Sequence, residues 1–256
     1  MIHPTAIVDP SARLGEGVEV GPYSIIGADV EIGADTWIGP HVVVQGPTVI
    51  GRGNRIFQFA SVGEACQDLK YNGEPTKLIV GDNNTIREGV TLHRGTVQDQ
   101  GETRVGSNCL LMAYSHVAHD VVMGDHVIIA NGTQLAGHVH VGDHAILGGN
   151  CGIHQFCHIG AHAFLGAGTT LVKDVPAYLM VQGNPAAPHG MNLEGLRRRG
   201  FSAQAISALR RAYKTVYREG RTVQDALVVL EPQAAEHPEI QPFIDSIATA
   251  TRGILR

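Results

Sequence analysis

The chain has 256 residues, of which 43% are hydrophobic and 17% charged, and its formal net charge is −5. This length fits one large domain or two small ones, and the apolar content excludes a disordered chain. No apolar run approaches the roughly 20 residues of a membrane span, and the N-terminus lacks the pattern of a signal peptide, so we expect a cytoplasmic protein without membrane insertion. No basic run indicates nucleic-acid binding.

Aliphatic residues recur at every sixth position through 2–62, 80–92 and, one residue out of phase, 105–171. A period of six fits neither the 3.6 of an amphipathic helix nor the 2 of a simple strand. It is typical of a solenoid in which each hexad forms a short strand and a turn, and three hexads close a triangular coil. The repeat therefore predicts an all-β, left-handed parallel β-helix over residues 1–189, with three hexads in each coil.

Two stretches interrupt the repeat, at 63–79 and 96–104, and the phase slip lies in the second. We expect both to be loops that project from the β-helix, where functional residues are often found. After Val175-Pro176 the hexads stop, and a small α-helical domain over 190–256 is predicted, with helices starting at Ser202, Thr222 and Pro238. This C-terminal region is mildly basic, whereas the rest of the chain is acidic.

Residues 18 positions apart should lie directly above one another on successive coils. His126, His144 and His162 then form one column, which we interpret as stacked outward polar side chains, because metal ligands converge on a point instead of following a line. No metal site is predicted.

The segment Tyr114 to Asp120 differs from these columns. The same spacing places Asp120 against His138 and puts Gly137 directly over His119, where a residue without a Cβ allows close approach. A histidine beside a carboxylate and below a backbone N–H offers a general base and an oxyanion donor. The arrangement favours catalysis over an inert polar patch. A smooth prism has no deep pocket, so we expect three copies to associate side by side and form grooves between them.

Several local runs are more specific than the hexads. They are Gln67-Asp68-Leu69-Lys70-Tyr71, Thr91-Leu92-His93-Arg94-Gly95-Thr96, His116-Val117-Ala118-His119-Asp120, Ala136-Gly137-His138-Val139, His154-Gln155-Phe156, Gln182-Gly183-Asn184-Pro185 and Asn192 through Phe201. Together these runs closely resemble the acyl-carrier-protein–UDP-N-acetylglucosamine O-acyltransferase family of lipid A biosynthesis. The resemblance covers essentially the whole chain.

This resemblance implies an enzyme that transfers an (R)-3-hydroxyacyl group from acyl carrier protein to the 3-hydroxyl of UDP-N-acetylglucosamine. It implies that His119 is the general base, that Asp120 is its acidic partner, and that the N–H of Gly137 faces the developing oxyanion. No cofactor or metal is implied, because the thioester on the carrier protein's phosphopantetheine arm is already activated.

The resemblance also implies the substrate contacts and the residues that limit acyl-chain length. The implied contacts are Gln67, Asp68, Lys70, His93, His116, His138, His154 and Gln155 for the sugar and acyl groups, and Asn192, Glu194, Arg198 and Arg199 for the nucleotide end. Ala167 and Pro185 match positions that close the far end of the hydrocarbon groove, and a small Ala167 predicts a chain of about ten to fourteen carbons.

Three other functions compete with this interpretation. A related N-acyltransferase would acylate an amine, but that family carries an additional N-terminal uridine-binding domain, whereas the hexads here begin at Ile2. A carbonic-anhydrase-like β-helix would hold zinc between subunits through three histidines. A non-catalytic scaffold would leave the arrangement of His119, Asp120 and Gly137 unexplained.

Overall fold

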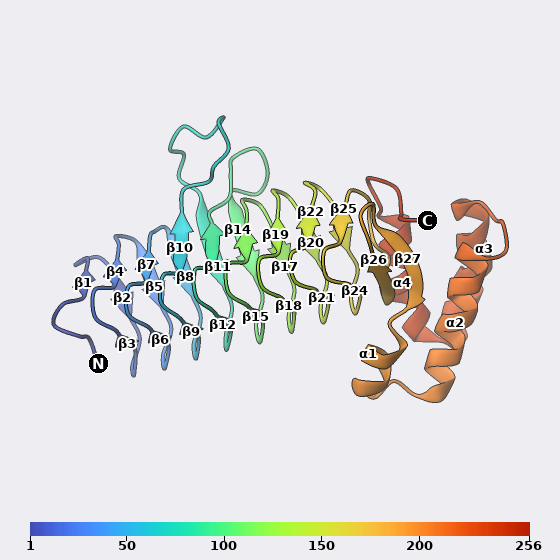
Figure 1. Ribbon diagram of the computed structural model, residues 1–256, viewed down its shortest axis with the longest axis horizontal. Helices are drawn as coiled ribbons and strands as arrows, with labels where there is room; N and C mark the ends of the chain where they lie inside the picture. The colour runs from blue at the N-terminus through green and yellow to red at the C-terminus, as the bar shows by residue number, and fades with distance from the viewer.

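The computed structural model describes all 256 residues and consists of a long triangular prism of short strands followed by a helical C-terminal region (Figure 1). Each strand contributes to one of three sheets, and consecutive strands move from one sheet to the next. The sheets are parallel except for a final antiparallel hairpin. The predicted left-handed parallel β-helix is confirmed. None of the helices is both long and apolar enough to cross a bilayer.

The three sheets are described in spatial order. The first sheet contains β1 (Ile7–Val8), β4 (Ile25–Ile26), β7 (Val43–Val44), β10 (Ser61–Glu64), β13 (Thr91–His93), β16 (His116–Val117), β19 (Gln134–Leu135), β22 (Gly152–Ile153) and β25 (Thr170–Leu171). The second sheet contains β2 (Arg13–Leu14), β5 (Val30–Ile32), β8 (Thr48–Ile50), β11 (Lys77–Val80), β14 (Glu102–Val105), β17 (Val122–Met123), β20 (His140–Val141) and β23 (His158–Ile159). The third sheet contains β27 (Ala187–Met191), β26 (Leu179–Gln182), β24 (Phe164–Leu165), β21 (Ile146–Leu147), β18 (Ile128–Ile129), β15 (Leu110–Leu111), β12 (Thr85–Ile86), β9 (Arg55–Ile56), β6 (Trp37–Ile38) and β3 (Glu19–Val20).

The register between coils follows the predicted circuit of three hexads. Ile26 pairs with Val44, and Val117 pairs with Leu135. The aliphatic residue of each hexad points into the prism, where most are almost completely buried, and burial of such side chains is the main stabilising contribution to folding.

Two coils are longer than the rest. Ile50 pairs with Val80, and Val80 pairs with Val105, so each of these coils contains an insertion beyond its three hexads. The insertions leave the prism as loops between β10 and β11 and between β13 and β14 (Figure 1). They comprise residues 65–76 and 94–101, and they differ from the predicted 63–79 and 96–104 because the flanking strands extend to pair with their neighbours.

The C-terminal region begins differently from the prediction. The hexads were expected to stop after Pro176, but β26 pairs in parallel with β24, with Met180 beside Phe164, after a step shorter than the regular circuit. The chain then turns back as β27, so the boundary predicted at 189 falls inside a strand. Because the interval between β24 and β26 is shorter than a regular coil, β26 falls outside the six-residue pattern, and the repeat did not predict this strand.

Four α-helices and one 3₁₀ turn follow. They are α1 (Leu193–Arg198), α2 (Ala203–Tyr217), α3 (Val223–Glu236), η1 (Pro238–Ile240) and α4 (Gln241–Ala248). Ser202 and Thr222 cap α2 and α3 as predicted, and Pro238 opens the turn that leads into α4. The side chain of buried Asp174 accepts hydrogen bonds from the N–H groups of Thr251 and Arg252, which fixes the C-terminal segment to the last coil.

A pair of buried asparagines joins the two coils that carry insertions. The Asn54 side chain accepts a 2.9 Å hydrogen bond from the N–H of Asn84, and the Asn84 side chain accepts a 2.8 Å bond from the N–H of Cys109. Both amides also donate to backbone carbonyls, and both residues are at most 1% exposed. They therefore satisfy buried backbone groups where the coils change length.

Replacing Asn84 with alanine should lower the free energy of unfolding by about 1–3 kcal/mol, because the buried N–H of Cys109 loses its acceptor. Equilibrium urea unfolding measures this change. Asn72→Ala on the exposed loop serves as the control and should have almost no effect. Equal effects of the two substitutions would contradict the role assigned to Asn84.

Candidate active site

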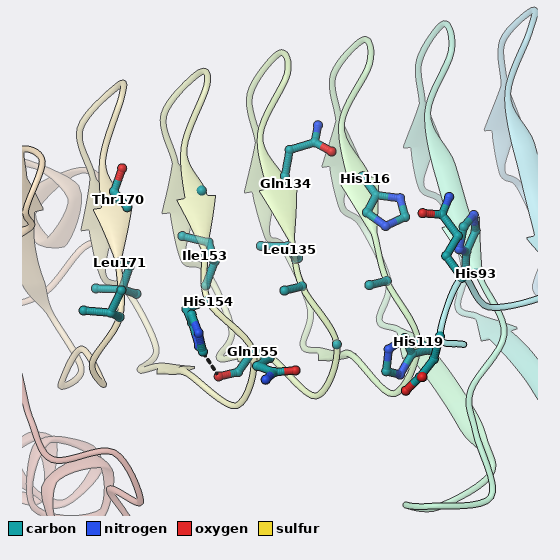
Figure 2. A pocket seen from close by; sticks show the side chains of 17 residues that line it. His93, His116, His119, Gln134, Leu135, Ile153, His154, Gln155, Thr170 and Leu171 are labelled. Atoms are coloured by element: carbon teal, nitrogen blue, oxygen red, sulfur yellow. Dashed lines mark hydrogen bonds between the residues drawn. The ribbon is translucent and has the colours of Figure 1, made fainter. Parts of the chain in front are cut away.

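A groove of about 700 Å³ runs along the outer surface of the first sheet. Figure 2 shows His116 and His119 toward one end, Gln134 in the middle, and Thr170 and Leu171 at the other end. The groove crosses successive strands of this sheet, from β13 to β25, so its length is set by how many coils are stacked.

Eight of the 17 predicted site residues meet in this groove. Its lining includes Gln67, Asp68, His93, His116, His119, Gly137, His154 and Gln155. Lys70 and His138 line an adjoining cavity of about 400 Å³, which shares Asp68, His119 and Gln155 with the groove. The loop 65–76, although far from Gln155 in sequence, therefore forms one wall of the same site.

His119 and Asp120 form a hydrogen-bonded pair at this site. Nδ1 of His119 lies 2.8 Å from Oδ2 of Asp120. An ionised carboxylate only accepts hydrogen bonds, so Nδ1 carries the proton and Nε2 presents a lone pair to the groove. The His119 side chain keeps 15% of its surface exposed, whereas Asp120 keeps 1%. Asp120 thus supports the imidazole from behind.

Thr96, on the loop 94–101, holds the Asp120 carboxylate in place. Its N–H donates to Oδ1 at 2.8 Å, and its hydroxyl donates to Oδ2 at 2.6 Å. Burial opposes ionisation of Asp120, but hydrogen bonds from His119 and Thr96 outweigh it and lower the pKa of the carboxyl group. Asp120 is therefore a carboxylate at neutral pH.

Gly137 lies against the ring of His119, as the three-hexad circuit predicts. A Cβ at this position would lie 2.4 Å from Cε1 and 2.6 Å from Nε2 of His119, so only glycine fits without displacing the ring. The N–H of Gly137 donates no hydrogen bond within the chain. Gly137 therefore combines a free backbone donor with close contact to the His119 ring, and a donor of this kind can stabilise an oxyanion.

His138 is held by residues that the sequence analysis did not identify. Its Nδ1 lies 3.0 Å from the carboxylate of Asp99, and its ring stacks on Phe156 with centroids 4.5 Å apart. Asp99 comes from the loop 94–101, and only the folded loop brings it to His138. Its contact could not be found from the hexad pattern, because the loop is outside that pattern.

Three potential metal ligands lie close together in His119, Asp120 and His138, whose donor atoms are within 4.8 Å of one another. However, both carboxylate oxygens of Asp120 already accept hydrogen bonds from Thr96, and Oδ2 also accepts from His119. A metal ion would have to replace these bonds. The contacts therefore favour an acid–base pair.

The column of His126, His144 and His162 forms as predicted, with ring centroids 4.7 and 4.8 Å apart.

Two further histidines of the groove, His93 and His116, are held neutral. Burial, together with His93 and His119 nearby, lowers the pKa of His116 to about 4, and burial also lowers the pKa of His93. Nδ1 of His116 lies 2.6 Å from the hydroxyl of Thr91. These side chains are therefore uncharged hydrogen-bonding groups at neutral pH.

The residues predicted for the nucleotide end do not join this groove within one chain. Asn192, Glu194, Arg198 and Arg199 line a separate cavity of about 310 Å³ together with apolar side chains of the third sheet. Asn192 caps α1, and Glu194 pairs with Arg198 along that helix. Arg199 donates to the carbonyl of His144 at 2.7 Å, and its Nη1 is buried without a partner.

Ala167 and Pro185 line none of these three cavities. The turn that contains Pro185 nevertheless lies beside the end of the groove at Thr170. The N–H of Thr170 donates to the carbonyl of Gly183, and its carbonyl accepts from the N–H of Ala186, so the turn that contains Pro185 packs beside this strand.

A parallel β-helix of hexapeptide repeats with a histidine–carboxylate pair in a surface groove defines the class of hexapeptide-repeat transferases. The model described as bacterial transferase hexapeptide (six repeats) matches residues 102–137 and 138–173, and the model described as UDP N-acetylglucosamine O-acyltransferase, domain 2, matches 174–255. The chain belongs to the UDP-N-acetylglucosamine O-acyltransferase family.

Similar proteins match over the full length. The acyl-(acyl-carrier-protein)–UDP-N-acetylglucosamine O-acyltransferase of Stutzerimonas stutzeri is 62% identical over 256 residues, covering 100% of this chain and 99% of the relative. The crystal structure of UDP-N-acetylglucosamine O-acyltransferase from Moraxella catarrhalis is 49% identical with a TM-score of 0.98, covering 100% and 99%. The Arabidopsis UDP-N-acetylglucosamine acyltransferase structure is 38% identical with a TM-score of 0.85, covering 100% of both chains.

The depressed pKa of His116 predicts a stability change with pH. Unfolded His116 binds a proton near pH 6.5, whereas the folded side chain binds one only near pH 4, so stability should fall as the pH drops between these values. The slope of stability against pH is proportional to the number of protons taken up on unfolding, and His116→Gln should lower that number by up to about one per chain. Urea unfolding at several pH values from 7 to 4 tests this, and an unchanged slope would contradict it.

Proposed function

We propose that the protein transfers an (R)-3-hydroxyacyl group from acyl carrier protein to the 3-hydroxyl of UDP-N-acetylglucosamine, the first step of lipid A biosynthesis. The observation that supports this most directly is the pair of His119 and Asp120 beneath the free N–H of Gly137, in a chain that belongs to this transferase family. Both substrates are water-soluble, and we therefore place the reaction in the cytoplasm.

The proposed chemistry begins at Nε2 of His119, which accepts the proton of the sugar hydroxyl as its oxygen attacks the thioester carbonyl. Asp120 stabilises the resulting imidazolium, and the N–H of Gly137 donates to the oxyanion of the tetrahedral intermediate. When the intermediate collapses, the new C–O bond remains, the C–S bond breaks, and the imidazolium returns its proton to the departing thiolate.

This sequence of steps requires no metal or cofactor in the protein. The thioester on the phosphopantetheine arm of acyl carrier protein supplies the activated acyl group, and the imidazole moves the only proton. The neutral His93 and His116 can position the acyl and sugar groups through hydrogen bonds, together with Gln67, Asp68, Lys70, His138, His154 and Gln155.

We propose that the active unit is a homotrimer. In one chain the groove lies on the first sheet, whereas the cavity of Asn192, Glu194, Arg198 and Arg199 lies against strands of the third sheet. Packing the third sheet of one copy beside the first sheet of the next would bring the two cavities together. Arg198 and Arg199 could then bind the diphosphate of the nucleotide as forked cations.

Acyl carrier protein is the second proposed partner, and an acidic protein of this kind would fit the basic side of α2. Arg210, Arg211 and Lys214 lie along this helix, Arg218 is its C-cap residue, and Arg211 and Lys214 line a shallow cavity between α2 and α3. Charge complementarity of this type mainly increases the rate of association.

His119→Ala should lower kcat by about 10²–10⁴-fold, because it removes the general base while the groove and the Gly137 N–H remain. Steady-state assays with a hydroxyacyl carrier protein and UDP-N-acetylglucosamine measure this loss. His126→Asn, at an exposed turn outside the groove, is the matched control and should keep nearly full activity. Retention of wild-type kcat by a folded His119→Ala protein would refute the mechanism.

We also propose that Ala167 and Pro185 close the far end of the acyl groove and that the preferred chain has about ten to fourteen carbons. Ala167→Met should shift the preference to shorter donors, since the longer side chain would occupy the space beside Thr170. Competition assays with donors of different length test this, and unchanged selectivity would count against the assignment.

A further inference from the structure

Gly152 is the only one of the 32 glycines with neither a positive φ nor an atom close to the position that a Cβ would take. Every other glycine either has a positive φ or has a neighbouring atom within 4 Å of the position that a Cβ would take. At Gly152 the φ is not positive and no atom lies within 4 Å. A Cβ at this position would therefore be unhindered in the isolated chain.

The position of Gly152 in its strand makes the absence of a side chain more unusual. It is the outward-facing residue of β22, directly before the buried Ile153, and it pairs with Gln134 on one side and Thr170 on the other. No other strand from β1 to β26 has glycine at its corresponding outward position. Glycine in a strand costs stability, so the fold alone would favour a larger residue.

The position without a side chain lies in the wall of the groove. Gly152 lines the groove together with His119, Gln134 and Thr170. His116, Gln134, Gly152 and Thr170 form one outward column on successive strands, which places Gly152 two coils, or about 10 Å, from the level of His116. Figure 2 shows Gln134 and Thr170 on the strands to either side of the strand that carries Ile153.

We propose that Gly152 is a specificity-determining residue that keeps the groove open for the distal part of a long acyl chain. This inference rests on the proposed transferase function. A side chain at residue 152 would interrupt the path between the catalytic end at His119 and the end at Thr170. Gly152 therefore determines which lengths of donor acyl chain fit the groove, and it does not affect the bond-forming step at His119.

The test is to replace Gly152 with alanine and with methionine and to compare long-chain and short-chain hydroxyacyl carrier proteins as donors. We expect Gly152→Met to lower the long-to-short ratio of kcat/KM by about tenfold or more, and Gly152→Ala to have a smaller effect in the same direction. Activity with the short-chain donor should remain close to that of the wild type. The thermal midpoint should be unchanged or raised, because glycine is unfavourable in a strand.

Val49→Met is the matched control, because Val49 is the outward residue of β8 on the second sheet and lies outside the groove. A wild-type protein that accepts no hydroxyacyl donor would overturn the proposed function itself. A wild-type protein that is active while Gly152→Met keeps the same donor preference would overturn only the role of Gly152. A change in assembly state of Gly152→Met on size exclusion would also overturn it, since the glycine would then serve packing between copies.

Discussion

The circuit of three hexads is the constraint on which the rest of the structure depends. Parallel backbone hydrogen bonds hold each coil on the next, and the inward aliphatic residues permit only one register, because a shift by one residue would turn the buried side chains outward. The same register fixes every outward column. The contact between His119 and Gly137 is therefore set by strand pairing at Val117 and Leu135, and does not depend on the flexibility of a loop.

Catalytic geometry also needs the insertion 94–101, because the prism alone leaves the Asp120 carboxylate without the hydrogen bonds from Thr96. Thr96 on the loop 94–101 donates two hydrogen bonds to the carboxylate, in addition to the bond from His119, and Thr103 on the next strand accepts the N–H of Asp120. The rigid coil supplies the imidazole and the backbone donor, while the loop fixes the carboxylate. This division is typical of sites whose supporting contacts hold the reactive groups in a productive arrangement.

The sequence was sufficient to predict the features that depend on the six-residue repeat. Hexad spacing alone placed Gly137 over His119 and stacked the histidine columns, because each depends only on counting along a regular coil. The spacing could not predict β26, because the interval between its paired residues on β24 and β26 is shorter than that of a regular coil. It also could not predict the hydrogen bonds of Thr96 and Asp99, since the path of an inserted loop is not periodic. The short helix α1 was not assigned from the sequence, because so short a segment carries too little apolar pattern to distinguish a helix from a turn.

Electrostatics explains why so many histidines can share one groove. Formation of an imidazolium at His119 would be opposed by positive charge on His93 or His116, whose rings lie 4.8 Å apart beside it. Burial lowers the pKa of both, so they stay neutral near pH 7 and add no repulsion. Asp120 remains ionised because its hydrogen bonds outweigh the cost of burial. A buried carboxylate therefore lies next to the only imidazole that the mechanism requires to become positive, while the neighbouring histidines retain their hydrogen-bonding groups for the substrate.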